Sequence, residues 1–303
     1  MSPKALLIAL RPHQWVKNFF VFAALVFAAG EHGKFDEHSV ARTVWAFLAF
    51  CLGSSAVYLV NDLFDIDSDR KHPTKRHRPI PSGALSVPAA WTAALLCAAG
   101  ALALAWNGAS GPPVAWVVLA YMLLNLAYSL RLKHVVLVDA FCIAGGFLLR
   151  VFGGGLAAGE HVSHWLMLCT LFLSLFLALC KRRAETDLLG EGRGEHRAIL
   201  LEYTPAFLDQ MVTVLAACTI LTYAMYTVSE DTARKFGASH SLIWTVPFVV
   251  FGLARYLLLV QRREAGGNPT GVLLGGDLLF GLDVLAWAGT VAVVLFLRHQ
   301  TSP

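Results

Sequence analysis

Charged residues are scarce in this chain. Only 15% of its 303 residues are charged, whereas 57% are hydrophobic, and the mean hydropathy is +0.61. So few charges cannot cover the water-facing surface of a globular protein of this length. Long polar stretches are lacking too, which leaves no room for an additional soluble domain of ordinary size. The composition therefore indicates an integral membrane protein.

Paired metal-binding cysteines and nucleic-acid-binding patches are also lacking. The six cysteines all lie inside or at the edge of apolar runs, and none forms a C-x-x-C pair. This placement favours packing between helices over a zinc site or a disulfide framework. No basic patch interleaved with aromatic residues stands outside the apolar runs. Nucleic acid is therefore excluded as an expected partner.

Apolar runs fill most of the chain. A membrane-spanning helix needs about 20 mostly apolar residues. Nine runs meet this need, near 14–30, 41–60, 88–106, 113–130, 135–156, 163–180, 206–228, 241–260 and 274–297. The runs are continuous, without the alternation of a membrane β-strand. The sequence predicts an all-α, polytopic membrane protein with nine transmembrane helices in one domain, 1–303, and the N-terminus lacks the pattern of a cleaved signal peptide.

The positive charges predict the orientation. Most of the 24 lysines and arginines fall in alternate connectors, including those near 61–87 and 181–205. Because lysine and arginine collect on the cytoplasmic side of a bilayer, these connectors are expected to face the cytoplasm. The N-terminus is then cytoplasmic and the C-terminus lies outside, with an odd number of crossings between them.

The acidic motif after the second run is the strongest sign of chemistry. Asn61, Asp62, Asp65 and Asp69 fall at positions i, i+1, i+4 and i+8, so a helix that continues past Val60 stacks the three carboxylates on one face. Such carboxylates suit Mg²⁺, which takes one or two protein carboxylates and completes its shell with substrate phosphates. Asp67 is expected to point into solvent.

Basic residues follow the acidic motif at once. The segment KHPTKRHRPIPSG contains Lys75, Arg76 and Arg78, with prolines that fix its path. Cations beside a magnesium site suit a diphosphate, because the metal neutralises part of its charge and basic side chains bind the rest. The competing interpretation is a charged loop in which acids and bases neutralise one another.

A second polar group follows the sixth run. Lys181, Arg182 and Glu185 lie within about one helical turn, so they are candidates for the same cavity as the acidic motif; the competing interpretation is a positive anchor beside a solvated acid. Intramembrane polar residues usually face a polar cavity or a partner. Lys17 and Asn18 are expected to line the active cavity. Arg150 is expected to pair with another polar group of the protein in a structural role. Tyr58 and Tyr128 are assigned to substrate binding.

Three segments carry a resemblance to a known family. The chain resembles the UbiA superfamily of intramembrane prenyltransferases, whose signature N-D-x-x-D-x-x-x-D is matched by Asn61, Asp62, Asp65 and Asp69. More narrowly, RPHQWVKN at 11–18, SSAVYLVNDLFDIDSDRKHPTKRHRPIPSG at 54–83 and LCKRRAE at 179–185 resemble its decaprenyl-phosphate phosphoribosyltransferase branch. The resemblance implies nine helices around a central cavity, in a bacterial cytoplasmic (inner) membrane.

One departure from the superfamily is informative. Members that act in quinone and haem pathways carry a second D-x-x-x-D motif, where this chain has Lys181, Arg182 and Glu185. The exchange of acids for cations suits a sugar donor that carries the diphosphate, phosphoribosyl pyrophosphate, and an anionic polyprenyl phosphate acceptor. The resemblance thus implies a Mg²⁺-dependent phosphoribosyltransferase of cell-wall biogenesis, with membrane lipids as surroundings and a homo-oligomer of unspecified size.

Site roles follow from this resemblance. Asp62, Asp65 and Asp69, with Asn61, are expected to hold magnesium, and Glu185 is expected to act in catalysis. The basic residues of the connector would bind the donor's phosphates, whereas Lys17, Asn18, Lys181 and Arg182 are candidates for the lipid phosphate or the donor's 5-phosphate. An aromatic prenyltransferase that uses a prenyl diphosphate is the alternative. A transporter is a further alternative, although the carboxylates crowd one membrane face instead of the midplane.

Overall fold

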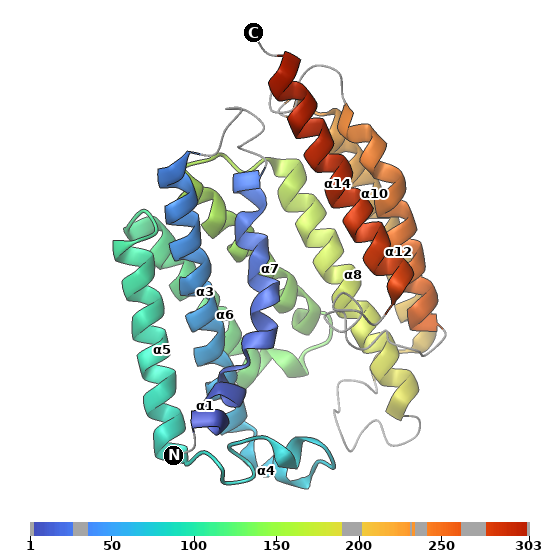
Figure 1. Cartoon of the computed structure of the whole chain (residues 1–303). Coiled ribbons are helices and arrows are strands. Elements are labelled where there is room, and N and C mark those ends of the chain that lie inside the picture. Colours follow the sequence, from blue (N-terminus) through green and yellow to red (C-terminus); the bar gives the residue numbers. More distant parts are fainter. Residues whose placement is uncertain are drawn as a thin grey trace. The chain divides into compact units, whose positions relative to one another are not determined.

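The computed structural model describes residues 3–26, 36–189, 202–230, 232–233, 241–261 and 277–301. Every regular element in these ranges is a helix (Figure 1). The all-α class predicted from the sequence is therefore confirmed. Close contacts divide the chain into two compact units, which are described separately below. The single domain 1–303 stays a prediction.

Seven helical segments of the described residues are long and apolar enough to cross a membrane. They are Glu37–Phe64, Val87–Asn107, Pro112–Leu130, Val138–Ala158, His164–Thr186, Pro205–Val228 and Ser241–Gln261. Each overlaps one of the predicted runs. A shorter apolar segment, Leu278–Val294, falls in the ninth run. The chain is thus a multi-pass membrane protein, and the predicted total of nine helices is not confirmed.

The first predicted run differs from expectation. Residues Pro12–Phe22 form a 3-10 helix, η1, which follows α1 (Pro3–Leu10). A proline at its first position and the polar Gln14, Lys17 and Asn18 interrupt the apolar pattern of an ordinary spanning helix. Residues 27–30 of this run lie outside the described part of the chain, so the structure does not test the run's end.

The first unit contains α1, η1, α3 (Glu37–Phe64), α4 (Ile66–Lys71), η2 (Lys75–His77), α5 (Val87–Asn107), α6 (Pro112–Leu130), residues 132–133 of η3 (Leu132–His134) and residues 149–158 of α7 (Val138–Ala158). Asp36 begins α3 as an N-cap, because its carboxylate accepts a hydrogen bond of 2.8 Å from the backbone N–H of Ser39. The core alternates small and large side chains. Ala46 and Ala49 of α3 are fully buried beside Phe50, and Val118 of α6 joins them.

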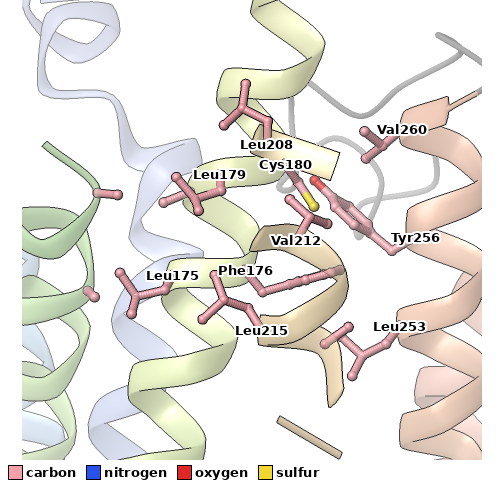
Figure 2. Close-up of a cluster of buried hydrophobic side chains, with 14 of the residues drawn as sticks. Leu175, Phe176, Leu179, Cys180, Leu208, Val212, Leu215, Leu253, Tyr256 and Val260 are labelled. Carbon is pink, nitrogen blue, oxygen red and sulfur yellow. The ribbon is translucent and has the colours of Figure 1, made fainter. Parts of the chain in front are cut away.

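The second unit contains residues 138–148 of α7, together with α8 (His164–Leu189), α10 (Pro205–Val228), η6 (Ser241–Thr245), α12 (Val246–Gln261) and α14 (Leu278–Thr301). Its core is drawn in Figure 2, where Phe176 of α8, Val212 of α10 and Tyr256 of α12 point toward one another. In lipid, such interlocking side chains associate helices through van der Waals packing. The core therefore packs α8 against α10 near the end of α8 that is predicted to face the cytoplasm.

Candidate active site

Two carboxylates of the acidic motif converge on one arginine in the first unit. Arg78 Nη1 lies 3.1 Å from Asp62 Oδ1 and 2.7 Å from Asp69 Oδ2. Both carboxylate side chains are only 2% exposed. Asp62 belongs to the last turn of α3 and Asp69 to the separate helix α4, so the two acids meet at Arg78 from two helices and not along one continuous helix face. A buried pair of acids is thus held together by a shared cation.

Arg11 is the second cation on Asp62. Its Nη2 donates to both carboxylate oxygens, at 2.6 and 2.8 Å, and its guanidinium carbon lies 5.0 Å from the centre of the Tyr58 ring. The backbone of Arg11 is left-handed, with φ 53°. This conformation costs a non-glycine residue roughly 1–2 kcal/mol. The segment RPHQWVKN does not by itself indicate a role for Arg11 in the site, because a contact across 51 positions has no local signal in the sequence.

Asp65 takes different partners. The helix is interrupted at Asp65, between α3 and α4, and its carboxylate accepts a bond of 2.9 Å from Lys133 Nζ and one of 3.2 Å from the Asn61 amide. The three aspartates therefore do not share a single set of partners, as an unbroken helix would have allowed. Asp67 has a side chain that is 94% exposed, which confirms its predicted contact with solvent.

The basic connector contributes residues of two kinds. Arg78 is bound to the acids, whereas Lys75 and Arg76 are exposed. Lys75 Nζ lies 4.0 Å from Asp69, and the Arg76 Nε contacts the ring of His77 at 3.3 Å. Exposed lysine and arginine side chains can turn toward an anion at small cost, because such surface contacts contribute about 0–1 kcal/mol.

The donor set suits a hard divalent cation shared with a ligand. Among the residues that the structure describes, no group of three or more His, Cys, Asp or Glu side chains gathers closely enough to hold a metal alone. Asp62 and Asp69 nevertheless converge on one positively charged atom group, so their oxygens face a common cation position. Magnesium needs only one or two protein carboxylates when phosphates supply its other ligands. The residues present therefore fit such a metal.

Asn18 lies at the centre of a buried network in the first unit. Its carbonyl oxygen accepts a hydrogen bond of 2.7 Å from Arg150 Nε. Its amide nitrogen lies 3.3 Å from Cys51 Sγ and 3.4 Å from the Ser54 hydroxyl oxygen. Arg150 also donates 2.8 Å to the Tyr121 hydroxyl. The hydrogen-bonding atoms of Asn18 are occupied by protein groups. Asn18 is therefore better placed to orient Arg150 than to bind a ligand directly.

A second polar cluster lies in the second unit. Arg182 and Asp139 are both 1% exposed, and the Arg182 Nε donates 2.8 Å to Asp139. Arg182 also contacts Glu185, and Lys181 Nζ lies 3.9 Å from Glu185, so the one-turn grouping predicted for these three is confirmed. The Tyr203 hydroxyl donates a hydrogen bond of 2.7 Å to the other Asp139 oxygen.

Tyr128, which the sequence assigns to substrate binding, lies on α6 in the first unit and is half-buried.

These features define a class of protein: an all-helical, multi-pass membrane protein with a buried acidic pair under basic side chains. Residues 18–270 match the model of the UbiA prenyltransferase family. The chain belongs to this family, as the sequence resemblance predicts.

Curated relatives make the comparison narrower. The chain is 36% identical over 289 residues to the decaprenyl-phosphate phosphoribosyltransferase of Corynebacterium glutamicum, covering 95% of this chain and 86% of the relative. It is 35% identical over 298 residues to the enzyme of the same name from Mycolicibacterium smegmatis, covering 96% and 92%. The resemblance to this branch therefore extends along nearly the whole chain.

A solved structure shares the fold. A UbiA homolog from Archaeoglobus fulgidus, bound to GPP and Mg²⁺, superimposes with a TM-score of 0.71 and is 20% identical in sequence. The superposition covers 96% of this chain and 99% of that one. The arrangement of helices is thus that of the UbiA fold.

Proposed function

We propose that this chain is a polyprenyl-phosphate phosphoribosyltransferase. It transfers the 5-phosphoribosyl group of phosphoribosyl pyrophosphate to a polyprenyl phosphate of the decaprenyl type and releases pyrophosphate. The observation that carries this proposal is the 35–36% identity, over at least 95% of the chain, to two decaprenyl-phosphate phosphoribosyltransferases. The acidic pair beside basic side chains supports it, because the donor carries a diphosphate that needs both a metal and cations.

The carboxylates would hold the metal. Asp62, Asp65 and Asp69, with Asn61, are the proposed ligands of Mg²⁺, which when bound neutralises part of the donor's diphosphate charge. The convergence of Asp62 and Asp69 on Arg78 supports a shared cation position there. Arg78, Lys75 and Arg76 then bind the diphosphate oxygens. Arg78 has to release at least one carboxylate to do so.

The reaction needs little acid–base chemistry. A lipid phosphate oxygen attacks the anomeric carbon of the ribose, the bond from that carbon to the pyrophosphate oxygen breaks, and the electron pair leaves with pyrophosphate, so the configuration inverts. Phosphate is already an anion at neutral pH, so no strong base has to remove a proton. The protein contributes positioning and stabilisation of the leaving charge, each able to supply several kcal/mol. Glu185, bound to Arg182 and near Lys181, orients Lys181 in this scheme.

The surroundings of the reaction are also part of the proposal. The acidic motif follows the second predicted crossing, at a connector rich in lysine and arginine. We place this connector in the cytoplasm, where the donor is water-soluble, with the N-terminus inside, the C-terminus outside and the protein in the bacterial inner membrane. The acceptor reaches the site from the lipid. Self-association into a homo-oligomer is proposed on the family resemblance alone.

Product analysis tests the function. The purified chain in detergent is incubated with Mg²⁺, decaprenyl phosphate and phosphoribosyl pyrophosphate labelled in the ribose. Label should enter the lipid phase, and EDTA should stop this transfer. Formation of a prenylated hydroxybenzoate from a prenyl diphosphate, with no transfer from phosphoribosyl pyrophosphate, would instead establish the aromatic prenyltransferase. Uptake into proteoliposomes without chemical change would establish a transporter.

Matched aspartate variants test the metal role. Asp62→Asn keeps the shape of a buried acid but weakens its hold on a cation, so transfer should fall at least about 100-fold, within the range of lost transition-state stabilisation. Asp67→Asn, at a 94% exposed site, is the control and should keep full activity. Folded Asp62→Asn protein with near wild-type turnover and unchanged Mg²⁺ dependence refutes the assignment.

A further inference from the structure

Lys17 has no counterion within the described part of the chain. Its side chain is half-buried in η1, and its ammonium forms no hydrogen bond or ion pair with any residue that the structure describes. The positive charges of Arg150 and Arg11 act on it and repel it. A half-buried ammonium with no acid beside it is costly in a membrane protein, and such residues usually mark a functional site. The position of Lys17 therefore calls for an explanation other than the side chains that the structure describes.

Tyr58 supplies a second polar group in the same neighbourhood. Its hydroxyl forms no hydrogen bond among the described residues, although the charges of Arg150 and Arg11 both act on it. Its ring lies beneath the Arg11 guanidinium. A tyrosine hydroxyl in such a place normally has a partner. Lys17 and Tyr58 thus offer two donors without a bound acceptor within reach of the same two arginines.

Protein contacts fix the position of Arg150 near Lys17 and Tyr58. It is 6% exposed, its guanidinium lies 4.5 Å from the centre of the Tyr121 ring, and Asn18 and Tyr121 orient it through neutral hydrogen bonds. Arg11 forms an ion pair with Asp62, which Arg78 also contacts. The neighbourhood of Lys17 therefore contains two further cations, Arg150 and Arg11, whose charges act on its ammonium.

The cluster of the second unit has the opposite balance. Arg182 is buried between Asp139 and Glu185, so its guanidinium is neutralised by protein carboxylates. An anion would have to break a buried ion pair to reach it, which costs several kcal/mol. Lys17 needs no such exchange.

We infer that Lys17, Tyr58 and Arg150 form a binding site for a phosphate monoester. The inference rests on the proposed function, whose reactants contain two such groups: the lipid phosphate of the acceptor and the 5-phosphate of the donor. Lysine serves as a point charge for phosphate, and the tyrosine hydroxyl adds a directed donor. Arg150 supplies the second positive charge. Arg182 is assigned to positioning within the second unit and not to phosphate binding.

Direct binding to the full-length protein tests the site. Farnesyl phosphate represents the acceptor phosphate, ribose 5-phosphate represents the donor's, and farnesol and ribose are the neutral counterparts. Equilibrium binding is measured for the wild type, Lys17→Met, Tyr58→Phe and the control Lys4→Met, which removes an exposed lysine of α1. Lys17→Met should weaken one phosphate probe at least ten-fold, Tyr58→Phe should weaken the same probe, and Lys4→Met should weaken neither.

The two probes separate the sources of the phosphate. A loss confined to farnesyl phosphate assigns the site to the acceptor, and a loss confined to ribose 5-phosphate assigns it to the donor. A melting temperature measured without ligand separates binding from folding, because Lys17→Met removes a repelled charge and should leave it equal or higher.

Two results overturn the site. One is a wild type that binds each phosphate no better than its neutral counterpart. The other is a folded Lys17→Met protein with wild-type affinity for both. Transfer of labelled ribose by the wild type is judged separately. A wild type that loses phosphate binding with Lys17→Met but transfers no ribose would refute the proposed reaction and keep the site.

Discussion

Arg11 Nη2 lies 2.6 and 2.8 Å from the two carboxylate oxygens of Asp62. The contact joins the loop between α1 and η1 to the last turn of α3. A guanidinium that meets both oxygens fixes the rotation of the carboxylate as well as its charge. The orientation of Asp62 therefore depends on a residue outside the acidic motif.

Arg11→Lys tests this dependence. Lysine keeps the charge but cannot hold the carboxylate with a planar fork, so Asp62 gains rotational freedom. We expect kcat/KM for phosphoribosyl transfer to fall about ten-fold, which corresponds to ~1.4 kcal/mol. Steady-state kinetics at saturating Mg²⁺ measure it, with Arg131→Lys at an exposed position as the control. Equal kinetics for both variants would contradict the positioning role.

The buried pair of Asp139 and Arg182 predicts a stability effect. Removing one partner of a buried ion pair costs about 3–5 kcal/mol when the remaining charge has no other partner, and we expect the lower end of this range because Arg182 keeps Glu185. Asp139→Asn should therefore lower the melting temperature of the detergent-solubilised protein markedly. Asp209→Asn is the matched control, since Asp209 pairs with Arg183 but is 48% exposed, and it should change stability by less than about 1 kcal/mol. Similar melting temperatures for the two variants would show that Asp139 is not a buried anchor.

Tyr203 predicts an alkaline limit to stability. Burial, with the Asp139 carboxylate beside it, raises the pKa of Tyr203 above the usual value of 10. The folded protein then keeps the phenol proton at pH values where the unfolded chain has lost it, so the unfolded state binds fewer protons. This contribution to stability is complete below about pH 10 and is lost as the pH rises further.

The variant Tyr203→Phe removes this titration. Melting temperatures measured from pH 8 to pH 11 should fall less steeply above about pH 10 for Tyr203→Phe than for the wild type. The variant should also melt at a lower temperature at neutral pH, because Asp139 loses a hydrogen bond of 2.7 Å. Parallel curves for the two proteins would remove Tyr203 from the alkaline transition.

Position 154 of α7 has no room for a side chain. A Cβ at this position of α7 would lie 1.8 Å from the backbone oxygen of Val21 in η1, a clash that only a backbone shift can relieve. Gly154→Ala should therefore lower the melting temperature strongly. Gly289→Ala in α14 meets no atom within 4 Å and should leave stability unchanged or raise it by up to about 1 kcal/mol. If Gly154→Ala melted at a higher temperature than Gly289→Ala, the close contact between α7 and η1 would be contradicted.

The sequence predicts most spanning helices closely because their apolar runs are uninterrupted. The run predicted near 88–106 is the helix Val87–Asn107, and that near 206–228 is Pro205–Val228. The run near 14–30 departs from an ordinary α-helix, since hydropathy averaged over it hides the proline and polar residues of the 3-10 helix Pro12–Phe22, and its residues 27–30 lie outside the described part of the chain. Composition sets the environment of a segment, and local polar residues set its geometry.

The site is predictable only in its local part. The closeness of Asp62 and Asp69 in the sequence lets both reach Arg78 although the helix breaks at Asp65, and one-turn spacing places Arg182 beside Glu185. The partners that complete the site come from distant positions: Arg11 for Asp62, Lys133 for Asp65 and Tyr203 for Asp139. Tertiary packing decides such contacts, and one sequence contains no periodic signal for them. The sequence therefore indicates the neighbouring cation Arg78, whereas it gives no sign that the distant Arg11 and Lys133 bind the acids.

Arg11 faces two opposed demands. Its left-handed backbone favours glycine, the residue that adopts φ 53° without steric penalty, whereas its contact with Asp62 requires a guanidinium. Glycine here would relieve the unfavourable backbone angle and remove the guanidinium that binds Asp62. Engineering this protein for thermal robustness by relieving unfavourable backbone angles would thus select, at this one position, the substitution most damaging to turnover.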